Sequence, residues 1–226
     1  MLGDAKHECI IWNKSWQNMS PEPMAPDSDL SSPTASMVID RMDEVLGREK
    51  AAVLASLYGL SRASSREDVF KCLERMTTHG IFSIPTSFAA HAGAESDART
   101  EIWAYHFDVP SPFDNAWGGL AHHSFDNIPV WGVLRHAVPE AYRRAGDIMQ
   151  EAWIRFAHGE EPWERFNKGK RWMIFRLEDS QIATESRDED RVYDIWEQLD
   201  ERGLVGDLFD LSVELCLRRR ELLKAS

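Results

Sequence analysis

One short stretch of this sequence, EIWAYHFD at residues 101–108, restricts the possible folds more than any other. Apolar and aromatic side chains occupy both of its alternating faces, with Ile102 and Ala104 on one and Trp103 and Tyr105 on the other. A strand with two apolar faces must be covered on both sides, which is typical of a parallel sheet packed between helices. The stretch therefore predicts an α/β fold with a buried strand.

Helical patterns dominate the rest of the chain. The clearest predicts a helix over residues 139–158, because apolar side chains recur three or four residues apart and Gly159 follows as a stop. Thr34 or Ser36 and Ser64 or Ser65 are candidate N-caps of two further helices.

Several further segments complete the predicted organisation. Shorter helices are predicted over 49–57 and 84–92, a late strand over 171–177, and C-terminal helices over 188–226, broken near Gly203 and Gly206. Residues 20–34 are rich in Pro, Ser and Asp and predict an exposed loop. The expected architecture is helix-rich with two or three strands, in one domain over residues 1–226.

Charge and hydropathy exclude several classes of partner. The net charge of −12, from 26 Lys and Arg against 38 Asp and Glu, argues against nucleic acid, whose binding requires clustered cations. No apolar run reaches the roughly 18 residues of a membrane span, and the N-terminus has no signal-peptide pattern. The three widely spaced cysteines predict reduced thiols and a cytoplasmic location.

No pattern predicts a metal ion, a cofactor or a serine nucleophile. The eight histidines show no spacing typical of a metal site, and the glycines form no phosphate loop. The string Gly59–Ala63 resembles Gly-x-Ser-x-Gly but ends in Ala and follows a helical pattern. A nucleophile elbow requires a strand before the serine, so this string does not predict one.

Two segments carry candidate chemistry. His7 and Glu8 lie in a turn between apolar runs, and His122 and His123 lie in a Gly-containing loop after the buried strand. Judged by residue type alone, these side chains fit a hydrogen-bonded turn carboxylate and a loop histidine as readily as they fit catalytic groups.

A resemblance to a known family favours the catalytic interpretation. The string GDAKHECIIW, residues 3–12, resembles the segment of type-B carboxylesterases and cholinesterases in which a strand ends in Gly and an acid follows. LAHHSFDNIPVWG, residues 120–132, resembles their Gly-x-x-His-Gly-x-Glu-Leu-Pro loop. The resemblance implies that Glu8 is the triad acid. Setting Asp126 against the family's acidic residue makes His123 the triad histidine, with His122 the alternative.

Other pieces resemble the family in the same order. WAYHFDVPSP, residues 103–112, is similar to its last core strand, WIRFAHGEEPW, residues 153–163, to a helix end, and RWMIF, residues 171–175, to its final strand. The chain departs from the pattern at Cys9 and Ser124, where the family usually has Gly, and Asn127 is an extra residue. The implied fold is the C-terminal half of an α/β-hydrolase with a small remnant of its parallel sheet. The half with the nucleophile and the oxyanion loop has no counterpart here.

Three functions are compatible with half a hydrolase. We favour an enzyme that uses His123 and Glu8 for general acid–base chemistry, such as cyclisation, isomerisation or elimination, in natural-product biosynthesis. An ester hydrolase would need a Ser-bearing half from another chain, and a binding module would need neither residue. A homodimer or a partner chain is expected to cover the incomplete core. The predicted binding residues for a small apolar substrate are Trp12, Trp117, His122, Phe125 and Trp131.

Overall fold

The computed structural model describes residues 1–13, 33–96, 100–188 and 191–217, and these form two compact units. Unit 1 consists of Met1–Glu8 and Pro85–Tyr193, and unit 2 consists of Cys9–Ile84 and Asp194–Ser226. The predicted 20–34 loop lies mostly outside the described residues, as does the end of the 188–226 segment.

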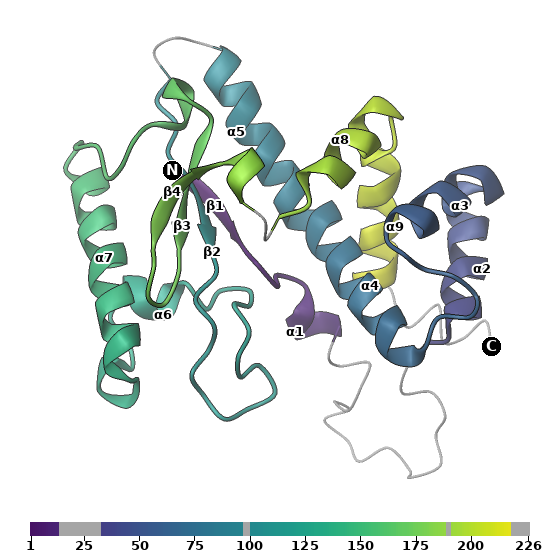
Figure 1. The fold of residues 1–226 in the computed structure, drawn as a ribbon, viewed down its shortest axis with the longest axis horizontal. Helices are drawn as coiled ribbons and strands as arrows, with labels where there is room; N and C mark the ends of the chain where they lie inside the picture. The colour runs from purple at the N-terminus through teal and green to yellow at the C-terminus, as the bar shows by residue number, and fades with distance from the viewer. Residues whose placement is uncertain (14–32, 97–99, 189–190, 218–226) are drawn as a thin grey trace. The chain divides into compact units, whose positions relative to one another are not determined.

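Unit 1 is built on a four-stranded mixed sheet (Figure 1). Its strands, in spatial order, are β1 (Leu2–Ala5), β2 (Ala104–Phe107), β3 (Arg171–Phe175) and β4 (Gln181–Thr184). The pairings β1–β2 and β2–β3 are parallel, with Gly3 opposite Tyr105 and Phe107 opposite Phe175, whereas β3–β4 is antiparallel. The predicted parallel sheet is thus confirmed for three strands, and the pattern did not predict β4.

Helices cover both faces of this sheet, as the two apolar faces of residues 101–108 predicted. Helix α7 (Glu140–Ala157) packs Met149 into one buried cluster with Phe107, and α5 (Ile84–Ser96) packs Ala90 into another with Trp172. Figure 1 shows α5 and α7 on opposite sides of the strands. The central strand β2 is therefore held by neighbouring strands at its edges and by side chains above and below.

The remaining elements of unit 1 are short. They are α6 (Asn127–Val130), η4 (Arg135–Ala137), η5 (Phe166–Lys168) and η6 (Glu185–Arg187). The long helix α7 matches the predicted 139–158 segment, since Pro139 precedes its first turn and Gly159, with a φ of 76°, follows its end.

Unit 2 consists of helices in its described part. They are α1 (Ile10–Asn13), α2 (Ala35–Leu46), α3 (Arg48–Leu57), α4 (Arg66–Thr78), a π-helical turn η3 (His79–Ser83), α8 (Tyr193–Glu201, which begins at the unit boundary) and α9 (Val205–Leu217). The hydroxyls of Thr34 and Ser65 accept hydrogen bonds from Met37 N and Asp68 N, so both predicted N-caps form.

The break between the C-terminal helices differs from its prediction in one respect. Gly203 has a φ of 63° and separates α8 from α9, but Gly206 lies inside α9. A single left-handed residue is enough to end a helix, and a glycine within a helix costs only about 1 kcal/mol. The buried face of α9 keeps Gly206 helical.

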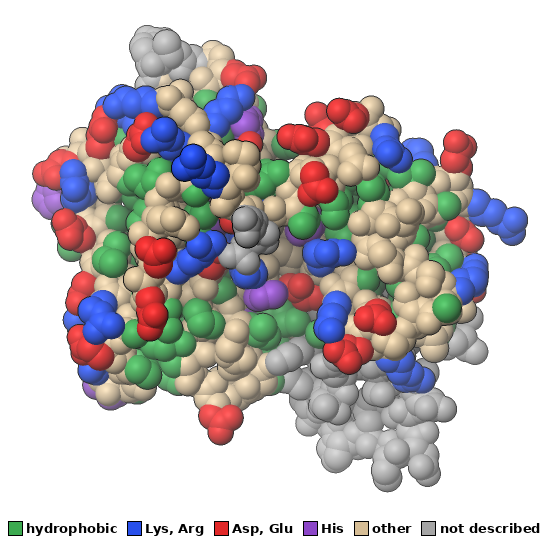
Figure 2. Space-filling model, in the orientation of Figure 1, with side chains coloured by type: hydrophobic (Ala, Val, Ile, Leu, Met, Phe, Trp, Pro, Cys, Tyr) green, Lys and Arg blue, Asp and Glu red, His purple; other side chains and the backbone are tan. Residues whose placement is uncertain are grey.

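No helix in the described part of the chain is long and apolar enough to span a bilayer. On the molecular face shown in Figure 2, acidic and basic side chains are intermingled. Over the whole sequence the acidic groups outnumber the basic ones, which agrees with the net charge of −12.

The close packing of β1 on β2 gives a direct test. A Cβ at Gly3 would lie 2.5 Å from the carbonyl oxygen and ring of Tyr105. Overpacking of this kind costs about 1–3 kcal/mol. We expect Gly3→Ala to lower the free energy of unfolding, measured by urea denaturation, by that amount.

Gly206→Ala is the matched control. A Cβ at this helical glycine meets no atom within 4 Å, and the substitution should raise stability by roughly 0.5–1 kcal/mol. Equal effects of the two variants would contradict the close approach at Gly3.

Candidate functional site

The structure brings Glu8 and His123 together, although 115 residues separate them in sequence. Nδ1 of His123 lies 2.6 Å from Oε2 of Glu8 and donates a hydrogen bond to it. The other carboxylate oxygen, Oε1, accepts a hydrogen bond of 2.7 Å from the backbone N–H of Ala5. The carboxylate is thereby fixed on both sides, with the imidazole ring oriented toward it.

The backbone around this pair extends the pairing of β1 with β2. The N–H of His7 donates to the carbonyl of Ala121 at 2.9 Å, and His7 and His122 form a short parallel bridge. Parallel strands end at the same edge of a sheet, so the segments that follow β1 and β2 meet there. This placement positions Glu8 against His123.

Three features shape the loop that carries His123. Ser124 has a φ of 61°, in the left-handed region that favours glycine. Asp126 accepts a hydrogen bond of 3.2 Å from the hydroxyl of Tyr105 on β2. The buried ring of Phe125 anchors the loop in the core beside Phe107.

The electrostatic surroundings favour the protonated form of His123. The hydrogen bond to Glu8 raises the pKa of His123, and the charges of Glu8 and Asp126 raise it further. Partial burial opposes these effects by disfavouring the imidazolium. The side chain is 33% exposed, whereas that of Glu8 is 9% exposed, so solvent reaches the histidine but hardly the acid.

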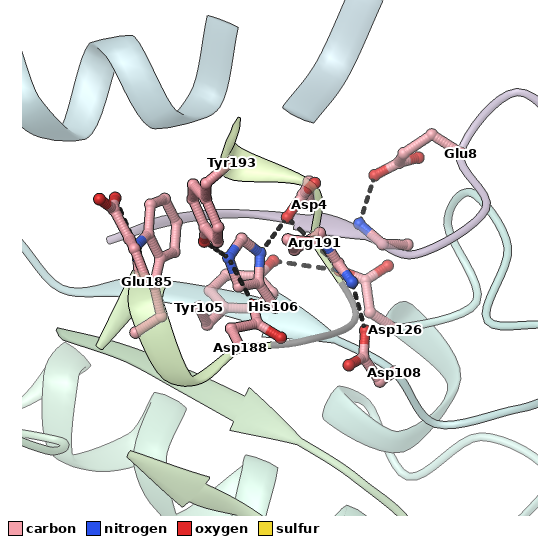
Figure 3. A network of polar contacts seen from close by, with 12 residues as sticks. Asp4, Glu8, Tyr105, His106, Asp108, Asp126, Glu185, Asp188, Arg191 and Tyr193 are labelled. Carbon is pink, nitrogen blue, oxygen red and sulfur yellow. Dashed lines mark hydrogen bonds and ion pairs between the residues drawn. The ribbon is translucent and has the colours of Figure 1, made fainter. Parts of the chain in front are cut away.

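A second histidine–carboxylate pair in unit 1 is deeply buried (Figure 3). Nδ1 of His106 is hydrogen-bonded to the carboxylate of Asp4, and Nε2 lies 2.8 Å from the hydroxyl oxygen of Tyr193. It also stacks on Trp172, with ring centroids 4.2 Å apart. Only 1% of the His106 side chain is exposed, and both ring nitrogens are engaged. This pair cannot meet a substrate.

Charged groups surround His106 and stabilise the same region. Arg191 donates a hydrogen bond of 2.9 Å to Asp108 and lies 3.7 Å from Asp4, and Asp188 lies 3.6 Å from the His106 ring. Nearby carboxylates raise the pKa of Arg191 against the effect of its burial. Buried charges of this kind require partners, so the network has a structural role.

The sequence did not predict this network. Asp4, His106, Asp108, Asp188 and Arg191 come from three separate stretches of the chain, and polar residue types of this kind are usually exposed. Only the alternation within residues 101–108 signalled that His106 is buried.

The predicted substrate-binding residues lie in different surroundings. The ring of His122 lies 5.1 Å from that of Phe125 and 6.1 Å from that of Trp117. Trp131 is 76% exposed. Trp12 belongs to unit 2, where its ring stacks on that of Phe82, with the ring centroids 6.2 Å apart. Their proposed role in binding remains a prediction.

An apolar hollow that the sequence did not indicate lies between α6 and α7. It is a shallow hollow that is open to solvent. Its lining includes Phe125, Ile128, Pro129, Val133, Tyr142 and Gly146. Phe125, two residues after His123, connects the histidine loop with this hollow.

The described residues contain no cluster of three or more His, Cys, Asp or Glu side chains arranged to hold a metal ion. The Gly-x-Ser-x-Gly-like string gives no nucleophile elbow. Ser61 is exposed in unit 2, after helix α3 rather than after a strand, and its hydroxyl contacts Ser64.

No protein-family model matches this sequence, and no curated protein matches it. Solved structures do match. A PNB esterase covers 84% of this chain, with a TM-score of 0.56 and 21% sequence identity. A thermophilic PNB esterase also covers 84%, with a TM-score of 0.56 and 20% sequence identity. EstA of Aspergillus niger covers 88% of this chain, with a TM-score of 0.61 and 14% sequence identity. The chain has the fold of part of a carboxylesterase.

The match covers only a portion of each esterase. The chain spans 36% of the length of the two PNB esterases and 39% of that of EstA. The resemblance seen in the sequence is thus confirmed for the fold. The chain, rich in helices and with a small sheet, shares its fold with that portion of these esterases.

The bond between Glu8 and His123 predicts a titration. Glu8→Gln removes the charged acceptor, so the pKa of His123 should fall toward or below its ordinary value of about 6.5. NMR titration of the imidazole protons measures this shift. Glu178→Gln, at an exposed carboxylate in the turn after β3, is the control and should leave the His123 titration unchanged.

The same shift sets a pH dependence of stability. Because the folded pKa of His123 is raised, its protonation stabilises the fold fully below pH 6.5, and this stabilisation is lost as pH rises through the folded pKa. Glu8→Gln should flatten that part of the curve. An unchanged pH dependence in this variant would contradict the pairing.

The left-handed Ser124 predicts a stabilising substitution. A non-glycine residue in this region costs about 1–2 kcal/mol, and glycine costs roughly 0.5–1 kcal/mol in unfolded-state entropy. Ser124→Gly should therefore raise the free energy of unfolding by about 0.5–1 kcal/mol. Ser56→Gly, at an exposed position inside α3, should instead lower it by about 0.5 kcal/mol. Thermal denaturation compares the two variants, and a loss of stability in both would refute the strain at Ser124.

Proposed function

We propose that this chain is an enzyme in which His123, oriented by Glu8, performs general acid–base chemistry on a small, largely apolar organic molecule. The observation that carries the proposal is the bond between Nδ1 of His123 and the Glu8 carboxylate, in a fold shared with esterases. The partial exposure of His123 and the apolar hollow beside Phe125 support it.

The geometry supports proton transfer as follows. With Nδ1–H held by Glu8, the imidazole presents Nε2 as the atom that removes a proton from a substrate. The resulting imidazolium is stabilised by the Glu8 carboxylate, and His123 then returns the proton to another substrate atom. Such a cycle catalyses isomerisation, elimination or cyclisation and contributes about 10²- to 10⁴-fold to rate.

Ester hydrolysis needs more than this pair. An acyl-transfer enzyme also requires a nucleophile and donors for the oxyanion, each worth several kcal/mol in the transition state. In the described residues, the Gly-x-Ser-x-Gly-like string has Ser61 after helix α3 rather than after a strand. For these residues we propose the non-hydrolytic chemistry, in a biosynthetic setting.

One observation favours a second candidate, an ester hydrolase completed by another chain. Strand β1 is the end strand of the sheet among the described residues. An open strand edge accepts a further strand, and a Ser-bearing partner added there would complete the sheet. A homodimer could cover the same edge. We place either activity in the cytoplasm, on the basis of three cysteines outside any disulfide.

A general-base probe tests the proposal without knowledge of the natural substrate. 5-Nitrobenzisoxazole opens by an elimination that begins with removal of one proton. We expect the purified chain to accelerate this reaction and His123→Ala to lower the rate at least about 10²-fold. His136→Ala, at an exposed histidine, should retain the rate. Equal rates in the two variants would exclude His123 as the base.

Two further readouts separate the alternatives. The rate should increase with pH through a pKa above about 6.5, because only the neutral imidazole is a base and Glu8 raises the pKa of His123. Labelling by a fluorophosphonate, alone or with a co-purified chain, would instead indicate a serine hydrolase. Absence of both activities, with biological function retained in His123→Ala, would indicate a binding module.

A further inference from the structure

The charge that lines the hollow between α6 and α7 is opposite to that of the chain as a whole. Among the described residues, its lining contains two cations, Arg135 and Arg143, and no carboxylate. In the sequence acidic residues outnumber basic ones by 38 to 26. Nearly all other residues of the lining are apolar. The hollow therefore offers an apolar surface together with positive charge.

The space between the two helices depends on a glycine. Gly146 is buried within α7, and a Cβ there would lie 3.5 Å from Cβ of Pro129 on α6. A glycine inside a helix costs about 1 kcal/mol relative to alanine. The amide of Gln150, a further polar group of the lining, donates to the carbonyl of Pro129 at 2.8 Å. A longer side chain at Gly146 would fill the space that is now open.

Contacts within unit 1 hold both guanidinium groups in place. Nε of Arg143 donates to Glu140 at 2.7 Å and Nη1 donates to the carbonyl of Val138 at 3.1 Å. Its Nη2 makes no hydrogen bond within the described part of the chain. Arg135 donates through Nη2 to Asp147 at 2.9 Å. Glu140 and Asp147 are exposed, so solvent weakens their hold on the two cations.

Phe125 connects the hollow with the loop that carries His123. Its buried side chain belongs to the lining, and its ring lies 5.1 Å from that of His122. Phe125 follows His123 by two residues, which span at most about 7 Å of extended chain. A molecule that lies in the hollow is therefore close to the histidine loop.

We propose that the hollow binds the substrate of His123 and that this substrate carries a carboxylate beside an apolar body. The apolar body lies against Phe125 and its neighbours, where its removal from water favours binding. The carboxylate lies at Arg143 and Arg135, because the planar donors of a guanidinium match the two oxygens of a carboxylate. This inference rests on the proposed function, since it names the class of molecule on which His123 acts.

Three probes that share one ring system test the inference on the full chain. They are naphthalene-2-carboxylate, the neutral naphthalene-2-carboxamide and the cationic 2-naphthylmethylammonium, and isothermal titration calorimetry measures their Kd values. We expect the carboxylate to bind about fivefold more tightly than the amide, which is the effect of one partly exposed charge pair. The ammonium should bind more weakly than both, and added salt should reduce the differences.

Variants locate the binding. Val133→Glu places a negative charge in the lining at an exposed position and should abolish the preference for the carboxylate. Val45→Glu, the same substitution at an exposed position on α2, is the matched control and should keep the preference. Arg143→Gln should reduce the preference, whereas Arg144→Gln, at an exposed position outside the lining, should not.

Three results would overturn the proposal. They are failure of the carboxylate to bind the folded wild-type protein, equal binding of carboxylate and amide, and a preference that Val133→Glu leaves unchanged. The wild-type comparison decides the question even where a variant fails to fold.

The elimination assay separates this inference from the proposed function. Naphthalene-2-carboxylate should slow the elimination of 5-nitrobenzisoxazole over the concentration range in which it binds, and binding without slowing would overturn the assignment of the hollow to the substrate. Elimination without a preference for the carboxylate would overturn this inference alone. Selective binding by a chain that has no elimination activity would refute the proposed function, and the hollow would remain a carboxylate site.

Discussion

The parallel pairing of β1 with β2 is the interaction on which the rest of unit 1 depends. It places Gly3 opposite Tyr105 and brings the chain after each strand to the same edge of the sheet. A slip of one residue would reverse every side chain between the two faces. In the observed register, Glu8 reaches His123 and Phe107 faces the cluster under α7, so one set of backbone hydrogen bonds determines both the candidate site and the core.

Burial separates the two histidine–carboxylate pairs that this sheet assembles. His106 and Asp4 lie between the sheet and its cover, where an unpaired charge would be costly, and further charged groups surround them. His123 and Glu8 lie past the ends of the strands, where the histidine reaches solvent. The same chemical pair is thus sealed in the core in one place and partly exposed to solvent in the other.

Local sequence signals predicted much of the fold. The caps Thr34 and Ser65, the helix pattern of α7 and the two apolar faces of β2 depend on residues near in sequence, and the structure confirms them. The signals failed for β4 and for the π-helical turn after α4. An antiparallel edge strand depends on its partner β3, and a π-helical turn depends on the close packing of Gly80 on Ser212, so neither has a strong local pattern.

The sequence by itself determined the residue types of the candidate site and, through resemblance, an order of segments typical of carboxylesterases. It also determined several helix ends, such as the caps at Thr34 and Ser65, because capping and periodicity act over a few residues. Only the tertiary structure decided that Glu8 and His123 meet and that His106 is sealed in a charged network. These contacts join residues about a hundred or more positions apart. Their formation depends on the packing of the whole unit, which compensates for the entropy of closing such long loops.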